Sequence, residues 1–133
     1  EMVNAARARG LDGEFHEGNI LLLDERERAA LRRDYVLASG IFYYRQNAPQ
    51  SFMEETLTCL FNLAERGVAF NSLSTWAEHP PSRDEFRADP MAILTFCRTL
   101  TPWVVLRHDY HTGDFKIYLR RHQSHINAPS NKT

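Results

Sequence analysis

The sequence has 133 residues, of which 43% are hydrophobic and 25% are charged, and its 16 basic and 17 acidic residues leave a formal net charge of −1. These values are typical of one globular domain with a buried core and argue against a disordered chain. They also argue against a strongly basic protein, so a nucleic-acid-binding face would need its basic residues gathered on one side.

The first fifty residues are predicted to form short helices and short extended pieces. A short helix is expected over residues 2–9, and two extended pieces about a Gly-Asn turn over 14–23. A helix with one buried face is expected over 25–42, because Asp24 is a good N-cap and apolar residues then recur every three or four positions. We expect this helix to be interrupted near Ser39.

A second long helix is predicted to begin after Ser51. Ser51 and Glu54 match a capping box, an apolar stripe follows, and Gly67 ends the helix. The apolar residues 68–70 are predicted to form a short strand, and residues 71–76 a small helix that ends before the two prolines.

The C-terminal part is predicted to contain a helix followed by a hairpin. Asp89 is expected to cap a helix over 90–100, because a proline follows it at the first helical position. Residues 103–110 and 115–121 are predicted to be two strands, since apolar and polar residues alternate strictly in the second one. Gly113 is expected to supply a positive φ in the turn between them.

The two cysteines and the absence of an apolar run bear on the compartment. Cys59 and Cys97 lie in apolar helical patterns, which predicts buried, reduced thiols, with a disulfide between two helices as the alternative. No apolar run approaches the ~20 residues of a membrane-spanning helix, and the first residues lack the apolar core of a secretory signal. We therefore expect an intracellular protein, cytoplasmic or nuclear, without a membrane partner.

From Ser51 the predicted order is helix, short strand, helix, helix, strand, turn and strand. This order resembles the winged helix-turn-helix family, and residues 99–103 with the following His-Thr-Gly-Asp turn are most similar to replication and partition proteins of mobile elements. The resemblance implies an α+β, mostly helical fold with a winged-helix-like C-terminal half. Its parts would be an N-terminal extension (1–50) of helices and short extended pieces packing on the core, a winged-helix-like domain (51–121) with a β-hairpin wing, and a polar tail (122–133).

The resemblance also implies a function: a non-enzymatic module of nucleic-acid metabolism, for DNA binding or for assembly of a replication or regulatory complex. The helix 90–100 would then be the recognition helix and 111–114 the wing. The candidate nucleic-acid-binding residues are Arg83, Arg87, Arg98 and Lys116. They would have to lie on one face, with the nearby acidic residues elsewhere.

Two other interpretations of the same residues remain open. In the first interpretation, the basic residues pair with neighbouring acidic residues on a solvated surface. In the second, the chain is a protein–protein interaction or dimerisation module without nucleic-acid binding, because the apolar faces of both long helices exceed what a small wing covers. A protein partner or homodimer is expected in that case. Aromatic residues such as Trp103, Tyr110 and Tyr118 are interpreted as packing residues rather than as a base-stacking platform.

Two patterns suggest metal chemistry. His108-x2-His111 and His122-x2-His125 are a pair of HxxH motifs, but the predicted hairpin places them at opposite ends, too far apart for one zinc ion. We therefore predict no metal site.

The second pattern is similar to that of metal-dependent nucleases. Asp109, Asp114 and Lys116 match it, but they lie at a hairpin mouth rather than in a core strand. No Gly-rich phosphate loop or hydrolase motif is present. The sequence thus predicts no catalytic residues, no cofactor and no enzyme.

Overall fold

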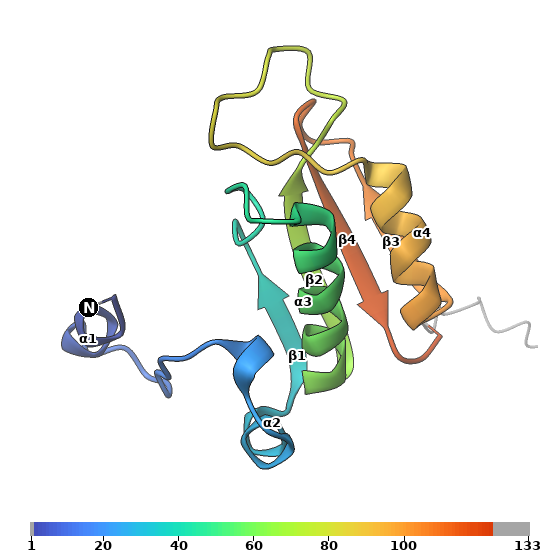
Figure 1. The fold of residues 1–133 in the computed structure, drawn as a ribbon. Coiled ribbons are helices and arrows are strands. Elements are labelled where there is room, and N and C mark those ends of the chain that lie inside the picture. The colour runs from blue at the N-terminus through green and yellow to red at the C-terminus, as the bar shows by residue number, and fades with distance from the viewer. Residues whose placement is uncertain (1, 124–133) are drawn as a thin grey trace, which may run out of the picture.

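The computed structural model describes residues 2–123 and contains a four-stranded mixed sheet with two long helices against it (Figure 1). The elements in chain order are α1 (Met2–Ala8), the 3-10 helix η1 (Ile20–Leu22), α2 (Glu25–Leu31), β1 (Arg33–Ala38), α3 (Pro49–Leu63), β2 (Ala64–Leu73), α4 (Pro90–Leu100), β3 (Trp103–Arg107) and β4 (Asp114–Arg120). Among these elements no helix has the length and apolarity that crossing a membrane requires.

The strands lie in the order β1-β2-β4-β3. β1 and β2 run parallel and are joined by the crossover helix α3, as a parallel pair requires. β4 is antiparallel to both β2 and β3, so β3 runs parallel to β2. α4 is thus a second crossover helix, and β4 returns to fill the position between β2 and β3.

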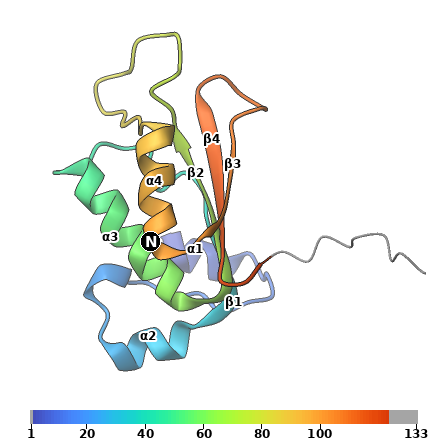
Figure 2. The same ribbon diagram turned by 90° about the vertical axis from the view of Figure 1, so that its right-hand side faces the viewer.

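Both crossover helices cover the same face of the sheet, as Figure 2 shows with α3 and α4 on one side of the strands. The core lies between them. Side chains from the loop after β1, from both helices and from β4 are fully buried there, among them Phe42, Met53, Ile93, Phe115 and Ile117. No described helix covers the middle of the opposite face, which we call the open face.

The first fifty residues differ most from the prediction. Asp24 caps α2 as predicted, its carboxylate accepting the Glu27 N–H at 2.8 Å, but that helix ends at Leu31. The chain then becomes strand β1, so the helix predicted over 25–42 is wrong beyond its second turn. Val36 and Ala38 pack on the core whereas Tyr35 and Leu37 are exposed, which is the alternation of a strand. The pairing with β2, distant in sequence, decides this segment.

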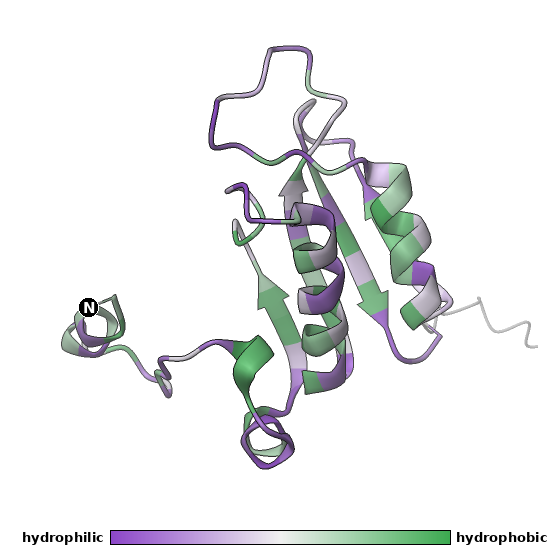
Figure 3. Cartoon of the chain, in the orientation of Figure 1, coloured by the Kyte–Doolittle hydropathy of each residue, from purple (hydrophilic) through white to green (hydrophobic). Residues whose placement is uncertain are grey.

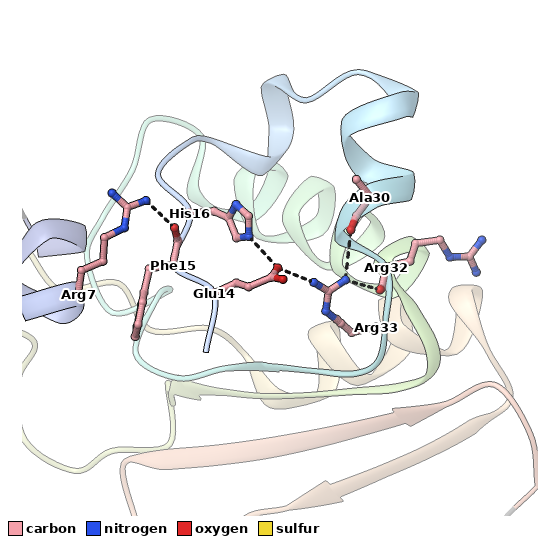
Figure 4. Close-up of polar contacts among 7 residues, drawn as sticks. All are labelled: Arg7, Glu14, Phe15, His16, Ala30, Arg32 and Arg33. Carbon is pink, nitrogen blue, oxygen red and sulfur yellow. Dashed lines mark hydrogen bonds and ion pairs between the residues drawn. The ribbon is translucent and has the colours of Figure 1, made fainter. Parts of the chain in front are cut away.

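The N-terminal segment is attached to the start of β1 by polar contacts (Figure 4). The Arg33 guanidinium donates to the Glu14 carboxylate at 3.3 Å, and Arg7 donates to the Phe15 carbonyl at 2.8 Å. None of the residues of α1 or α2 is buried. The extended pieces predicted over 14–23 are only partly correct, since residues 20–22 form η1.

In the middle of the chain, one predicted strand is confirmed and two predictions are wrong. α3 begins at Pro49 after Ala48, which has a φ of 46°, so Ser51 lies inside the first turn and the predicted capping box is wrong. The strand predicted over 68–70 is confirmed, but β2 runs from 64 to 73 and replaces the start of the small helix predicted after it.

The C-terminal elements are those predicted. The Asp89 carboxylate accepts the Met91 N–H at 3.0 Å and caps α4, and the hairpin β3–β4 follows. Gly113, however, does not have a positive φ. It is constrained by space, because a Cβ at this position would lie 3.2 Å from the Cβ of Ala77. The buried, free thiols of Cys59 and Cys97 are also confirmed.

The mostly helical, winged-helix-like fold class is wrong. β1, from within the expected N-terminal extension 1–50, is a member of the same sheet as the elements of 51–121. The boundary expected at residue 50 therefore separates no structural units. The tail expected from residue 122 lies almost entirely outside the described residues.

Candidate functional site

The carboxyl ends of the parallel strands β1 and β2 lie beside each other at one end of the sheet, where both arrows point in Figure 1. Two loops leave from this end, 39–48 after β1 and 74–89 after β2. In open α/β sheets, ligands bind in the crevice outside the carboxyl ends of the strands. The polar side chains that gather here therefore form the candidate site.

Asn71 of β2 holds the loop that follows β1. Its side-chain oxygen accepts the Gly40 N–H at 2.9 Å, and its side-chain nitrogen donates to the Tyr43 hydroxyl at 2.6 Å. Gly40 has a φ of 75°, a left-handed conformation that favours glycine. One side chain of the neighbouring strand thus fixes both the turn and the first tyrosine of this loop.

Asp114, the first residue of β4, lies between two tyrosines. The Tyr43 hydroxyl donates to one carboxylate oxygen at 2.6 Å and the Tyr110 hydroxyl donates to the other. Burial, the hydrogen bond to Asp114 and the charge of Asp114 together raise the pKa of Tyr43 to about 12, against a smaller lowering by the hydrogen bond from Asn71. Burial and Asp114 likewise raise the pKa of Tyr110. Both phenols are consequently protonated at neutral pH and act as donors to the carboxylate.

Lys116 completes this cluster, since it faces Asn71 across the β2–β4 pair and its Nζ lies 4.7 Å from the centre of the Tyr110 ring. We call Tyr43, Asn71, Tyr110, Asp114 and Lys116 the tyrosine–aspartate cluster. Asn71 and Lys116 also line a hollow of about 260 Å³ on the open face. The cluster therefore joins the carboxyl end of the sheet to that face.

A second polar contact lies in the loop after β2. Ser74 Oγ and His108 Nε2 are 2.8 Å apart, and the His108 ring stacks on Trp76 with a centroid separation of 4.7 Å. A serine nucleophile needs a base that a third group orients. Among the hydrogen bonds of the described residues, none joins His108 to a carboxylate, so this pair is interpreted as packing.

The structure does not bring the four candidate nucleic-acid-binding residues together. Arg87 is largely buried and pairs with Glu85 at 2.7 Å. Arg83 lies in the same loop, whereas Arg98 lies in the last turn of α4. Lys116 lies on the open face, the opposite side of the sheet from α4. They do not form a single basic face.

The metal and nuclease patterns are not assembled either. Asp109 pairs with Arg107 at 3.1 Å, whereas Asp114 is bound by the two tyrosines. Within residues 2–123 no three His, Cys, Asp or Glu side chains are placed to hold one metal ion. His125 of the second HxxH motif lies outside the described residues.

Sequence reasoning missed most of the tyrosine–aspartate cluster. Asn71 was placed in a small helix, and Asp114 was considered only as a turn or nuclease residue. The sequence did contain a signal for strand β1. The short apolar segment 35–38 is followed by Ser39-Gly40, and a strand is commonly followed by such a turn pair. A strand there would have predicted a parallel pair with a polar carboxyl end.

Comparison with known proteins shows similarity to methyltransferases. The chain is 35% identical over 94 residues to a Mycobacterium tuberculosis (strain ATCC 25618 / H37Rv) protein named "Putative methyltransferase Rv1506c", and the match covers 66% of this chain and 57% of that protein. No family model matches the sequence.

Two solved structures of magnesium protoporphyrin IX methyltransferase (ChlM) from Synechocystis PCC 6803 have the same fold. The one with bound SAH superimposes with a TM-score of 0.64 at 10% identity, covering 91% of this chain and 60% of ChlM. The one with bound SAM gives a TM-score of 0.58 at 13% identity, covering 91% and 55%. The chain thus spans somewhat more than half the length of each protein that it matches.

These findings correct the identification made from element order. The sheet and its helices have the Rossmann-like fold of these methyltransferase structures, so the resemblance to winged helix-turn-helix proteins is wrong. The expected non-enzymatic DNA-binding module is overturned with it, because the relative and both structural neighbours are named as methyltransferases.

Proposed function

We propose that this chain forms part of a methyltransferase that uses S-adenosylmethionine (SAM), with the carboxyl ends of β1 and β2 at the reaction site. The observation that carries the proposal is the 35% identity over 94 residues to the M. tuberculosis protein. The position of the tyrosine–aspartate cluster supports it, because this is the end of the sheet at which α/β enzymes bind ligands.

The described residues do not form a complete nucleotide-type site on their own. Such sites lie at a topological switch point, where successive crossover helices pass to opposite faces of the sheet. Here α3 and α4 cover the same face, so no switch point lies among residues 2–123. The chain would supply one wall of the crevice, the loop held by Asn71, and a further segment would supply the other wall.

The cluster suits the side of the site that faces the methyl acceptor. Methylation of an oxygen or nitrogen nucleophile releases a proton, and a carboxylate beside the nucleophile accepts a hydrogen bond from it and takes up that proton. Asp114 is placed for this role because Tyr43 and Tyr110, both protonated at neutral pH, hold its two oxygens in position.

The test is binding of S-adenosylhomocysteine (SAH) to a hybrid protein, measured by titration calorimetry. In the hybrid, this whole chain replaces the matching region of the M. tuberculosis relative. We expect the hybrid to bind SAH with an affinity within about tenfold of the unaltered relative, a difference of about 1.4 kcal/mol. The change Asn71→Ala, which releases Gly40 and Tyr43, should weaken binding by about tenfold or more.

Arg98→Ala is the matched control, because Arg98 is exposed in the last turn of α4, far from the carboxyl ends of the strands, and should leave binding unchanged. A hybrid that unfolds cooperatively but fails to bind SAH, when the relative binds it, would refute the proposal. Failure of the relative itself to bind SAH would also refute it, because the similarity that supports the proposal would then carry no methyltransferase chemistry.

A further inference from the structure

The loop after β2 carries a half-exposed tryptophan, Trp76, which is its largest side chain and is 50% exposed. The loop, residues 74–89, rises beyond the carboxyl end of β2 in Figure 1, and most of it is hydrophilic in Figure 3. Tryptophan is highly buried on average in folded proteins. The indole of Trp76 is therefore an apolar ring held at the surface of a polar loop.

Hydrogen bonds at the base of the loop fix the backbone of this tryptophan. The Thr75 N–H donates to the Ala88 carbonyl at 3.0 Å, and the Ala88 N–H donates to the Leu73 carbonyl at 2.9 Å. Ser74 is fully buried, and its Oγ accepts the Trp76 N–H at 3.1 Å. The exposure of the indole is thus not the result of a loose loop.

The indole is the outermost of three aromatic rings that rise from the core. Phe115 is fully buried, and the His108 ring stacks on it with centroids 6.1 Å apart and planes at 26°. The Trp76 ring stacks on His108 at 4.7 Å and 10°. The contact of 2.8 Å between Ser74 Oγ and His108 Nε2 holds the middle ring. Because His108 covers one face of the indole, the exposed part of Trp76 is its opposite face and its edge.

The stack stands at the end of the sheet where we place the reaction. Trp76 lies three residues after Leu73, which pairs with Asp114 in the β2–β4 register. Asp114 and Phe115 are consecutive in β4, so the carboxylate and the base of the stack lie on the two faces of the same strand end. The free indole face and the tyrosine–aspartate cluster therefore belong to one end of the molecule.

The position along the sheet separates this indole from the proposed donor crevice. In the proposed function, the wall of that crevice is the loop 39–48 after β1, which Asn71 holds. Trp76 belongs to the loop after β2, one strand further from the crevice. It lies on the side of Asp114, which we place beside the methyl acceptor.

We infer that the free face of Trp76 binds a planar aromatic ring of the methyl acceptor. This inference rests on the proposed function and names the class of acceptor for it. Stacked planar rings gain attraction through their π systems in addition to the apolar area that they remove from water. The contact between Ser74 and His108 lies beneath the indole, on the side away from the acceptor.

The test follows the indole N–H signals by heteronuclear NMR during titration with beta-naphthol, which has two planar aromatic rings and a hydroxyl. Trp76 and Trp103 are the two tryptophans of the chain, and the variants Trp76→Leu and Trp103→Leu assign their signals. Trp103 is the matched control, because it is 40% exposed but lies on the open face at the start of β3. Both this chain alone and the hybrid are titrated.

We expect beta-naphthol to shift the Trp76 signal saturably and to leave that of Trp103 in place, because a ring stacked on an indole changes the magnetic field at its protons. Trp76→Leu should weaken binding by about threefold or more, as measured from the backbone N–H signals of the loop 74–89, and Trp103→Leu should not. Beta-decalol, the saturated and puckered counterpart, should bind about threefold or more weakly than beta-naphthol.

An unchanged Trp76 signal in both this chain and the hybrid would overturn the inference, and if the hybrid bound SAH the proposed function would still stand. Equal shifts of the Trp76 and Trp103 signals would also overturn it, because beta-naphthol would then bind exposed rings in general. A larger shift of Trp76 by adenosine than by beta-naphthol would overturn it in favour of the adenine ring of the donor. A selective shift of Trp76 in a hybrid that fails to bind SAH would uphold the stacking site and refute the proposed function.

Discussion

The two faces of the sheet are made by the same strands and yet have opposite surroundings. Ile117 of β4 is fully buried against the helices, whereas Lys116, one position earlier, is exposed on the open face. On β3, Val104 packs on the core and Val105 is 52% exposed. The helix-covered face supplies the core of this chain, and the open face, which carries Lys116 and Arg120 beside apolar residues such as Val105, contributes little to it.

The contrast shows that hydrophobicity alone does not identify the interior. Burial stabilises a fold only where apolar area leaves water, at about 25 cal/mol per Å². Val105 and Leu37 have the chemistry of core residues, but they remain in contact with water in the described structure. Four tests by substitution would break or sharpen this comparison, in order of decreasing effect.

The largest difference is expected between Phe115→Ala and Val105→Ala. Phe115 is fully buried on the covered face, so its truncation should lower the free energy of unfolding by about 3–5 kcal/mol. Val105→Ala on the open face should change it by at most about 0.5 kcal/mol. Urea unfolding followed by circular dichroism measures both. Equal losses would mean that the open face is already covered within this chain.

Gly67→Ala tests a position on the open face where the backbone of the neighbouring strand leaves no room for a side chain. A Cβ at residue 67 would lie 2.5 Å from the Leu119 carbonyl oxygen of the neighbouring strand, so β2 and β4 would have to separate. We expect a loss of about 1–3 kcal/mol in the free energy of unfolding. Gly18→Ala is the matched control, because no atom lies within 4 Å of a Cβ there. A neutral Gly67→Ala would contradict the register of β2 and β4.

Two successive arginines at the end of β4 extend the comparison of the two faces of the sheet to polar side chains. Arg121 donates to the carbonyls of Ala64 and Phe61 at 2.7 and 2.6 Å and lies over the Phe61 ring, whereas Arg120 is exposed on the open face. Arg121→Met should cost about 1–3 kcal/mol, because it removes a charged donor from both carbonyls, of which that of Phe61 keeps only the Ala64 N–H. Arg120→Met should be nearly neutral. Chemical denaturation measures both losses of stability. Equal losses for Arg121→Met and Arg120→Met would mean that the contacts of Arg121 with the end of α3 do not stabilise the fold.

The smallest effect is expected at the tyrosine–aspartate cluster. Asp114→Asn removes the charge that adds to the effect of burial on Tyr43, so the pKa of Tyr43 should fall from about 12 toward its ordinary value of 10. Because the folded state holds this proton more tightly than the unfolded state, the contribution to stability is complete below pH 10 and is lost as pH rises toward 12.

Ultraviolet titration of phenolate absorbance measures this change, and Tyr43→Phe identifies which transition belongs to Tyr43. The Asp114→Asn protein should also lose less stability between pH 10 and 12 than the unaltered chain. An unchanged Tyr43 titration in Asp114→Asn would mean that burial alone sets its pKa.

The difference between the two ends of the chain explains which predictions failed. The elements after residue 89 were predicted with nearly correct bounds, because Asp89-Pro90 and the alternation in 115–119 act within a few residues. The segment 33–38 was placed in a helix, because its apolar residues satisfy a helical and a strand spacing equally well. The candidate site was missed with it, since Asn71 and Tyr43 meet only when β1 lies beside β2.

The sequence by itself determined the local features: the capped helices α2 and α4, the C-terminal hairpin, the buried thiols and a charge balance that excludes a uniformly basic surface. Only the tertiary structure decided that residues 33–38 form a strand, that both crossover helices share one face, and that Tyr43, Asn71 and Asp114 form one cluster. The physical reason is range. Caps and turns are set by neighbouring residues, whereas a parallel strand pair and the apolar face that it leaves open depend on contacts between residues about thirty positions apart.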